Sequence, residues 1–562
     1  MKINKRLAAV LDVLLLLAIF WAVRYWHSRQ YGLYEDDLTI IPDAFQRSFS
    51  SLIGYIFIYI THFYGHARPL SDSSIYFFSW IGWQIAGLWG PYLLGYLITA
   101  MNIGLFYWLM RRTAGRSFAL IAGLGYILYS ADTTQAFLTH SLGVQPSVLL
   151  ILLAMHAYLS NKRILAYLLA FVVLFSYELP FLLLAAAPLF KKKWNKALWK
   201  EILWHTGILV VMLAAIYLFR TMIGEGRVSG LGMKDLLTTP FVHSLEGPLV
   251  SLGSFAYRPL QAIQGLNLEV GLAILLAFGL FWWILSRLDV PTQVKLQDLR
   301  QAVRDPAARR ALPEEVKALG RIFVIGAVML ILAYPLTFTV RAYALSGRDT
   351  RVHLAGVAGA AVLVAAIAFF LIYVTNGSRW RKVINALIAL ELAFLAGYGF
   401  VIQRDYVLSW QYQREFWTEL LPLIPDAGEG TVILVDPAAL HDTRQIGANY
   451  WNLPRVLMQL YTYPENMKAL PVVHRLAQNW PSKLLAADGR IQINADTVYS
   501  VPEYYGEVEP QNVILIQAEN GQLVRREEVT LNGQEVSLKP AAALPLPTLP
   551  HAFLYHLMID QP

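Results

Sequence analysis

The chain has 562 residues, of which 56% are hydrophobic and only 15% are charged, so a protein that is soluble throughout is excluded. Its net charge of +8 does not indicate nucleic-acid binding, because the Lys and Arg residues gather in short connections between apolar blocks. The absence of cysteine excludes disulfides, thiolate metal sites and cysteine nucleophiles.

The apolar residues fall in blocks of about 20, the length at which a helix crosses the hydrocarbon core of a bilayer. The first block, 7–26, follows Lys2, Lys5 and Arg6 and lacks a clear small-residue cleavage site. We therefore predict a retained first span whose N-terminus is cytoplasmic.

A long outer loop, 27–90, follows the first span. It holds the acidic sequence Tyr34-Glu35-Asp36-Asp37, an aromatic and aliphatic stretch at 45–64, and three Trp residues near its end. Aromatic residues of this kind favour the headgroup level, so we predict helices that lie along the outer interface. The alternative is an additional helical hairpin through the membrane.

Ten further apolar runs follow, which gives about eleven spans in all. Every second connection between them is basic, which orients the chain with those connections in the cytoplasm. We predict a second outer loop at 224–266 and a cytoplasmic loop at 287–321. The runs are 91–110, 117–131, 143–160, 164–177, 179–190, 202–223, 268–286, 322–340, 353–375 and 383–402.

Hydropathy falls after about residue 403, so we divide the chain into a membrane domain, 1–403, and a soluble domain, 404–562. Segments 431–436 and 512–517 read as short strands, 454–460 as a helix, and Asn532-Gly533 as a turn. The fold class is therefore a mainly α, polytopic membrane protein with a small α/β domain. An odd number of spans places that domain outside the cytoplasm, and we predict a multi-pass protein of the plasma or inner membrane.

Ionisable residues collect at the outer ends of the predicted spans, and acids and bases that converge at one interface indicate a site. A carboxylate there can act as a general base or hold a divalent metal, and nearby arginines can bind a phosphate. An apolar groove between helices can hold a lipid tail. Together these features favour group transfer from a lipid-linked phosphate. The residues are Glu35, Asp36, Asp37, His66, Arg68, Asp132, His140, Glu178, Arg341, Arg348, Asp349, Arg351 and His353.

Several short motifs resemble the GT-C glycosyltransferases that use polyprenyl-phosphate sugars, including the protein O-mannosyltransferase and aminoarabinose-transferase branches. Glu35-Asp36-Asp37 stands where this family keeps its acidic motif, and Arg68-Pro69-Leu70 is similar to a segment after its first loop. Ser176-Tyr177-Glu178 looks like the Ser-Lys-Glu of some members, with Tyr177 in place of the lysine, which puts a phosphate-binding role at that position in doubt. The likeness covers about residues 1–400 in layout.

The resemblance implies a hexosyl- or pentosyltransferase of the cell envelope that glycosylates a hydroxyl of a protein, lipid or glycan. Either Asp36 or Asp37 would be the base of an inverting attack, with Asp36 favoured. The neighbouring carboxylates, Glu35 included, would orient it, and Asp36 and Asp37 would hold Mg²⁺ or Mn²⁺ if a metal is used. The remaining implied roles are donor-phosphate binding by Arg68, Arg348 and Arg351, and lining of the substrate cavity by His66, His140 and Glu178.

Each of these assignments has an alternative. The acidic sequence would also suit a solvated loop, Arg68 could extend to lipid headgroups, and Glu178 could be a paired acid at a kinked helix junction. A ligase or polymerase of lipid-linked oligosaccharides is the second enzymatic hypothesis. A transporter would predict charged residues at mid-membrane, discontinuous helices and inverted repeats, and none is visible in the sequence. The third class is a scaffold without catalytic activity.

Overall fold

A computed structural model describes residues 5–63, 67–191, 194–226, 232–290, 313–338, 341–448, 452–541 and 549–560. The chain divides into two compact units. Met1–Arg29 and Phe49–Arg404 form the first, which we call the helical unit, and Gln30–Ser48 and Asp405–Pro562 form the second, the α/β unit. The sequence analysis placed the segment 30–48 with residues 1–403. Its contacts group it instead with the C-terminal part of the chain.

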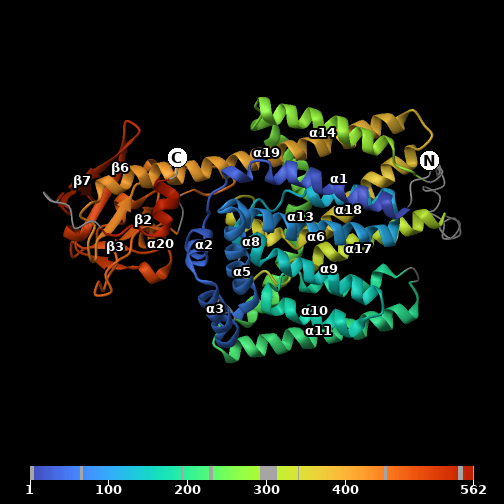
Figure 1. Cartoon of the computed structure of the whole chain (residues 1–562), viewed down its shortest axis with the longest axis horizontal. Coiled ribbons are helices and arrows are strands. Elements are labelled where there is room, and N and C mark those ends of the chain that lie inside the picture. The colour runs from blue at the N-terminus through green and yellow to red at the C-terminus, as the bar shows by residue number, and fades with distance from the viewer. Residues whose placement is uncertain are drawn as a thin grey trace. The chain divides into compact units, whose positions relative to one another are not determined.

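The helical unit is built almost entirely of helices, most of which run side by side, while α5 and α8 run across them (Figure 1). Its elements are α1 (Lys5–Tyr25), η1 (Ser28–Gln30, at the boundary), α3 (Phe49–His62), α5 (Pro69–Ala86), α6 (Trp89–Ala114), α7 (Arg116–Ile127), α8 (Leu138–Gly143), α9 (Gln145–Leu159), α10 (Arg163–Ser176), η2 (Phe181–Phe190), α11 (Lys196–Met222), α13 (Met233–Gln264), α14 (Leu268–Ser286), α17 (Glu314–Leu332), η3 (Arg348–His353), α18 (Gly356–Thr375) and the first part of α19 (Trp380–Leu420).

Seven helices of the described chain are long and apolar enough to cross a membrane, and the protein is a multi-pass membrane protein. The runs predicted at 117–131, 164–177 and 179–190 fold as α7, α10 and η2, which are shorter apolar helices. Because an α-helix rises only about 1.5 Å per residue, the 12 residues of α7 are too short for a bilayer core. Length and composition therefore support fewer full spans than the predicted eleven.

Small residues allow α18 to pack closely against its neighbours. A Cβ atom added at Gly359 of α18 would lie 2.3 Å from the backbone nitrogen of Leu330 in α17, and one added at Gly125 of α7 would lie 3.3 Å from the Cα atom of Ala361. Such close approach maximises van der Waals contact between helices where no water is displaced. The Ala- and Gly-rich sequence of α18 thus suits its place between α7 and α17.

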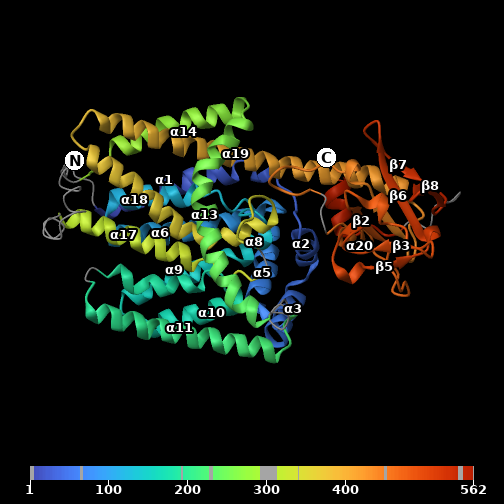
Figure 2. The ribbon, with the colours of Figure 1, turned by 180° about the vertical axis from the view of Figure 1, so that it is seen from behind.

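The segment predicted as the outer loop 224–266 forms the 32-residue helix α13 over most of its length. Three prolines lie inside this helix, and they favoured a loop in the sequence because proline removes a backbone hydrogen bond. The helix runs across the direction of α17 and α18 (Figure 2), and it is not among the seven helices suited to spanning. Most of the predicted loop 287–321 lies outside the described residues.

The first helix is tied to α6 and α7 by a buried carboxylate. Asp12 is 4% exposed, and its two oxygens accept hydrogen bonds of 2.7 Å each from the guanidinium of Arg116. The hydroxyl of Tyr107 donates a further bond of 2.6 Å to Asp12, and Arg111 lies 3.6 Å away. These bonds connect α1 with both α6 and α7.

The α/β unit contains a five-stranded sheet in the order β4-β2-β1-β6-β7, where β1 pairs in parallel with β2 and β6. Two two-stranded sheets, β3-β5 and β8-β9, accompany it. The strands are β1 (Val432–Val435), β2 (Val472–Leu476), β3 (Ile491–Ile493), β4 (Val498–Tyr499), β5 (Gly506–Val508), β6 (Val513–Glu519), β7 (Gln522–Arg526), β8 (Glu528–Leu531) and β9 (Gln534–Ser537), and the helices are α2 (Asp37–Gln46), α20 (Leu453–Leu460), α21 (Phe553–Tyr555), the π-helical turn η9 (His556–Asp560) and the 3-10 turns η4 (Leu421–Leu423), η5 (Pro437–Ala439), η6 (Trp480–Ser482), η7 (Pro502–Tyr504) and η8 (Pro510–Asn512).

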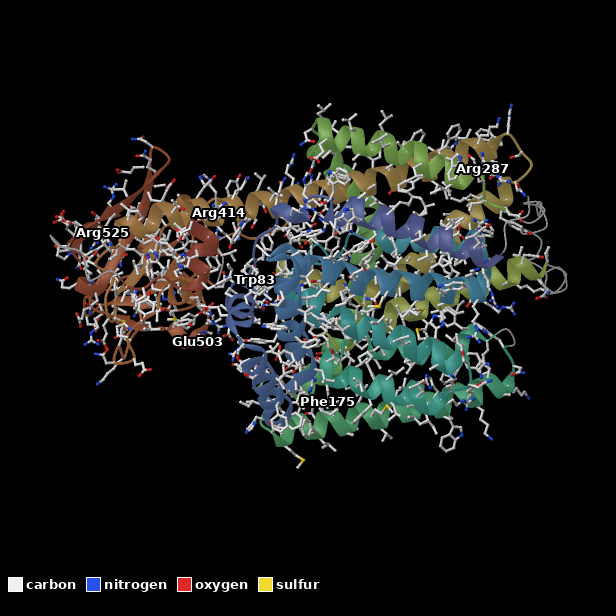
Figure 3. The ribbon with its side chains drawn as sticks, in the orientation of Figure 1. Trp83, Phe175, Arg287, Arg414, Glu503 and Arg525 are labelled. Atoms are coloured by element: carbon white, nitrogen blue, oxygen red, sulfur yellow. The ribbon has the colours of Figure 1, made fainter. Side chains whose placement is uncertain are left out.

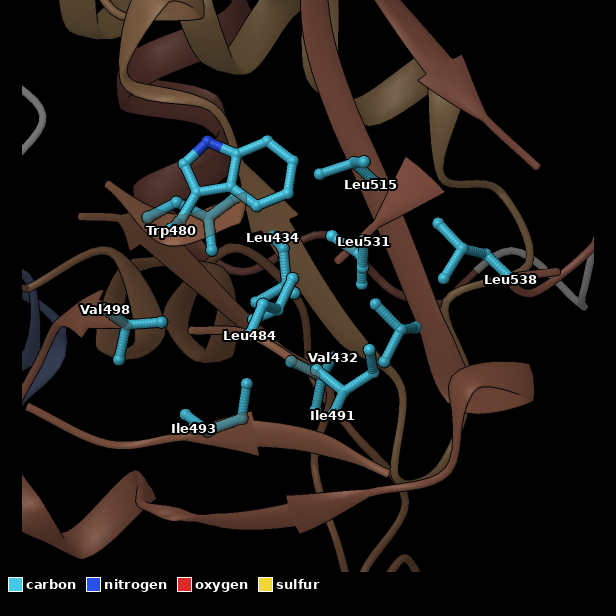
Figure 4. Packing of buried hydrophobic residues seen from close by; sticks show 12 residues of the cluster. Val432, Leu434, Trp480, Leu484, Ile491, Ile493, Val498, Leu515, Leu531 and Leu538 are labelled. Carbon is cyan, nitrogen blue, oxygen red and sulfur yellow. The ribbon is translucent and has the colours of Figure 1, made fainter. Parts of the chain in front are cut away.

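A hydrophobic core fills one face of this sheet around Trp480, Leu434 and Leu515 (Figure 4). Burial of these side chains is the main stabilising contribution, at roughly 25 cal/mol for each Å² of apolar surface. At the edge strand β7, Arg525 (Figure 3) forms a buried, two-pronged ion pair with Asp426. The unit therefore has its own core and its own buried polar anchor.

Candidate functional site

Residues Glu35–Asp37, which we call the acidic turn, form a tight bend that leads into α2. The amide of Asp37 donates to the carbonyl of Tyr34 at 2.9 Å, and that of Leu38 donates to the carbonyl of Glu35 at 3.2 Å. Glu35 has a φ angle of 53°, in the left-handed region that non-glycine residues seldom occupy. Backbone strain of this kind persists only where the surroundings hold it, and it gathers at functional sites.

Hydrogen bonds with the C-terminal half of α19 and with Asn452, the residue before α20, hold this turn and the residues before it. The hydroxyl of Tyr34 donates to the carbonyl of Tyr406 at 2.8 Å, and Gln413 donates to the carbonyl of Leu33 at 3.2 Å. Asn452, before α20, donates to the carbonyl of Glu35 at 3.0 Å. These bonds join residues that are hundreds of positions apart in the sequence, so long-range contacts within the α/β unit fix the turn.

The three carboxylates of the acidic turn differ in exposure. Glu35 is 5% exposed and Asp37 is fully buried, whereas Asp36 is half-buried. Asp36 is the N-cap residue of α2, yet its side chain makes no hydrogen bond to the amides of that helix. Asp36 is thus the most exposed carboxylate of the turn.

Two predicted site residues of the helical unit pair with each other. The Nε atom of Arg68 donates to Oε2 of Glu178 at 3.0 Å, and its Nη2 atom donates to Oε1. Arg220 of α11 donates to the same Oε2 at 3.3 Å, and the guanidinium of Arg68 lies 4.4 Å from the ring centroid of Tyr177. Arg68 and Glu178, separated by 110 positions, therefore form one buried ion-pair group.

The electrostatics of this group keep Glu178 ionised. Burial acts to raise the pKa of Glu178, but the charges of Arg68 and Arg220 and the bonds from Arg68 outweigh it, so the pKa lies well below its ordinary value. The pKa of Arg68 is correspondingly raised by Glu178 against the opposing effect of burial. Tyr177, which occupies the lysine position of the related motif, stacks on Arg68 and so supports the pair.

Three arginines of the helical unit interact electrostatically with a second buried acid, Asp132, or with His140. We call Arg24, Arg348 and Arg351 the arginine cluster. Asp132 interacts electrostatically with Arg24 and Arg351, and His140 interacts with Arg348 and Arg351. The 3-10 helix η3, which carries Arg348 and Arg351, is held in place because the hydroxyl of Thr350 accepts from the amide of Thr133 at 3.0 Å.

Asp132 is fully buried and only partly satisfied. Its Oδ1 atom accepts from the amide and the hydroxyl of Thr134 at 2.9 and 2.8 Å, while its Oδ2 atom has no hydrogen-bond partner. Burial raises the pKa of Asp132 to about 6, against the opposing effects of the Thr134 bonds and of Arg24 and Arg351. The Nε atom of Arg351 also lacks a partner. Within the described residues, Asp132 thus keeps one oxygen, and Arg351 its Nε atom, without a hydrogen-bond partner.

The structure therefore groups some predicted residues and separates others. Arg68 lies with Glu178, and Arg348 and Arg351 lie with His140, all in the helical unit, whereas the acidic turn belongs to the α/β unit. His66 lies outside the described residues. Arg24 and Arg220 were missed, although each is an arginine within an otherwise apolar run, which is a signal of a functional or paired charge.

No group of three or more His, Asp and Glu side chains that could hold a metal ion occurs within the ranges that the structure describes. Asp36 and Asp37 point to a metal only as a pair of neighbouring carboxylates, one of which is fully buried. Metal binding by this pair stays a prediction, and no step below uses a metal.

Comparison with known proteins finds no matching family model and no matching curated protein. The chain matches two crystal structures of ArnT from Cupriavidus metallidurans. The first, bound to undecaprenyl phosphate, is 11% identical over 77% of this chain and 83% of that one, with a TM-score of 0.36. The second, in the apo state, is 14% identical over 77% and 82%, with a TM-score of 0.29.

Proposed function

We propose that the protein is a GT-C-like glycosyltransferase that moves a sugar from a polyprenyl-phosphate donor to an acceptor hydroxyl on the outer face of the plasma or inner membrane. The N-terminus would be cytoplasmic and the α/β unit extracytoplasmic, as the alternation of basic connections favours. The observation that carries the proposal is the acidic turn, a strained bend in which one carboxylate is accessible between two buried ones.

Asp36 is the proposed catalytic base. It would remove the proton of the acceptor hydroxyl, whose oxygen attacks the anomeric carbon on the face opposite the phosphate. The bond between the anomeric carbon and the phosphate oxygen then breaks, and polyprenyl phosphate leaves with the electron pair. This sequence inverts the anomeric configuration. Glu35 and Asp37 are buried and would position the turn.

The arginine cluster is the better of the two arginine groups for binding the donor phosphate. Arg348 and Arg351 are half-buried, and the described surroundings of Arg351 leave its Nε atom without a partner. Arg68, in contrast, is committed to Glu178 through two hydrogen bonds. Guanidinium groups bind phosphate through charge-assisted, often bidentate hydrogen bonds, and Arg351 keeps its Nε atom for such a bond. We therefore propose phosphate binding by Arg348 and Arg351, with Arg68 as a positioning residue.

The test is transfer from radiolabelled polyprenyl-phosphate sugars by the purified full-length protein. The variant is Asp36→Asn, which keeps the size of the side chain and removes the base, and we expect a loss of transfer of at least about a hundredfold. Asp43→Asn is the matched control, because Asp43 lies on the same helix, is 40% exposed and pairs with Arg47. We expect this control to retain wild-type transfer.

Two results would contradict the proposal. If Asp36→Asn and Asp43→Asn both transfer at the wild-type rate, the acidic turn is not the base. If the wild-type protein neither binds nor turns over any polyprenyl-phosphate sugar, the scaffold or transporter hypothesis replaces the enzyme. Loss of donor binding without loss of turnover at saturating donor in Arg351→Gln would support the assignment of the phosphate site.

A further inference from the structure

A cavity of about 420 Å³ lies in the helical unit, between the ends of α6, α9 and η2 and the first half of α17. It is distinct from the acidic turn and from the arginine cluster. We call it the cationic cavity, and its lining residues are Arg112, Thr113, Leu159, Leu189, Phe190, Lys191, Ala318, Arg321, Ile322 and Ile325.

This cavity lies at the end of the helices where the chain begins. Arg116, which follows α6 directly, contacts Asp12 in the first half of α1, so the C-terminal end of α6 lies near the N-terminal half of α1. The connections at this end carry the basic residues that the sequence assigns to the cytoplasm. A ligand in the cationic cavity would thus come from the leaflet or the solvent on that side.

The cavity lining carries three positive side chains and no carboxylate. Arg112 is exposed and donates only to neutral groups, the hydroxyl of Ser160 at 3.2 Å and the carbonyl of Leu159 at 2.6 Å. Lys191 is partly balanced, because Glu201 accepts from its Nζ atom at 2.6 Å. Glu201 balances Lys191, whereas the charge of Arg112 faces neutral partners only, which favours an anion in this part of the cavity.

The opposite part of the lining is apolar. Ile322 and Ile325 of α17 face the cavity together with Leu159, Leu189 and Phe190. On α17 the neighbouring Phe323 and Val324 are 46% and 42% exposed, so the apolar surface continues to the outside of the unit. A small hydrophilic anion would leave the apolar side of the cavity uncovered. A ligand that joins a phosphate to alkyl chains would contact both the positive and the apolar side of the lining.

We propose that the cationic cavity binds the headgroup phosphodiester of an anionic phospholipid, with the first part of an acyl chain against Ile322 and Ile325. Basic pockets between transmembrane helices on the cytoplasmic side are suited to such headgroups, and the volume is in the range of small-ligand pockets. The shared chemistry, a phosphate ester, could also come from a soluble molecule, and the apolar walls favour the lipid. The proposal does not depend on the glycosyl transfer described above.

The experiment measures lipid binding to the full-length protein in detergent by native mass spectrometry. The probes are dioleoyl phosphatidylglycerol, dioleoyl phosphatidylcholine and glycerol 3-phosphate. The cavity variant is Arg112→Gln/Arg321→Gln. The matched control is Arg287→Gln/Arg379→Gln, which removes the same charge from two exposed arginines outside the cavity. Arg287 lies at the end of the helical unit where the chain begins (Figure 3).

We expect phosphatidylglycerol to bind the wild-type protein at least tenfold more tightly than phosphatidylcholine. The cavity variant should lose this preference, while the control pair stays within twofold of wild type. The single variant Arg112→Gln, which removes an exposed side chain with neutral partners, should weaken phosphatidylglycerol binding about threefold and covers the case in which the double variant is unstable.

Three outcomes would overturn the proposal. Equal binding of the two lipids to the wild-type protein would show that the cavity does not select an anion. Equal losses in the cavity variant and the control would show that only general surface charge matters. Binding of glycerol 3-phosphate as tight as that of phosphatidylglycerol would assign the cavity to a soluble phosphate ester.

Discussion

Two buried acids of the helical unit, Glu178 and Asp132, have opposite electrostatic states. Glu178 receives hydrogen bonds from two arginines, and its pKa lies below the ordinary value. Asp132 is bonded by Thr134 on one oxygen only, and its pKa is raised to about 6. The Glu178 side chain is 15% exposed and Asp132 is fully buried, and the two sites also differ in the number and geometry of their donors. A charge that is bonded on all sides supports the structure, and one that is incompletely bonded is available for function.

The largest effect is expected for Glu178→Gln. The substitution removes the carboxylate that is hydrogen-bonded to Arg68 and Arg220, and breaking a largely buried pair in this way costs about 3–5 kcal/mol of folding free energy. We expect a marked fall in the thermal unfolding midpoint of the purified protein in detergent. Glu269→Gln is the control, because Glu269 pairs with His27 but is 42% exposed, and it should leave the midpoint nearly unchanged. Equal shifts in the two variants would contradict the difference in burial.

A smaller effect of opposite sign is expected for Asp132→Asn. The Asn side chain keeps the acceptor for Thr134 and cannot ionise, so the variant should be more stable than wild type at pH 8 by on the order of 2 kcal/mol. The folded pKa of Asp132 is raised to about 6, so the folded state holds this proton over a range where the unfolded state has lost it. The wild-type protein therefore loses this stability as pH rises from about 4 to about 6.

The check is thermal unfolding of wild type and Asp132→Asn at pH 5 and pH 8. The advantage of the variant should be larger at pH 8 than at pH 5. Glu178 has the opposite dependence, because its stabilising contribution is present above the ordinary pKa of a glutamate and is lost as pH falls below it. An advantage of Asp132→Asn that does not change with pH would mean that the carboxylate is not the cause.

The smallest effect is expected for Thr350→Val. This change removes the hydroxyl that accepts from the amide of Thr133 and contacts its hydroxyl at 3.0 Å, so it should cost about 1–2 kcal/mol. Because Thr350 positions η3, we also expect weaker binding of polyprenyl phosphate, measured by tryptophan fluorescence, with the fold intact. Thr375→Val, at the far end of α18 on an exposed turn, is the control and should leave binding unchanged.

Several elements could be read directly from the sequence. The strands predicted at 431–436 and 512–517 correspond to β1 and β6, the helix predicted at 454–460 to α20, and the turn at Asn532-Gly533 joins β8 to β9. The apolar runs of α1, α6, α14 and α18 are also correct. These features depend on residue type, apolar periodicity and segment length, all of which are local.

The prolines of α13 led the sequence analysis to predict a loop. All three occur inside one helix, which its packing in the helical unit stabilises. The contacts of the segment 30–48 could not be predicted for a different reason. Its packing partners are α20 (Leu453–Leu460) and α21 (Phe553–Tyr555), which lie far along the chain, and nothing in its own sequence identifies them.

The sequence by itself determined the class of protein, the course of most helices and strands, and the presence of charged groups at the ends of the spans. Only the tertiary structure decided which charges interact, namely Arg68 with Glu178 and Arg351 with Asp132. It also decided that Asp36 is the most exposed carboxylate of the acidic turn. The physical reason is that hydropathy and length belong to a segment, whereas the partner of a buried charge depends on contacts between distant parts of the chain.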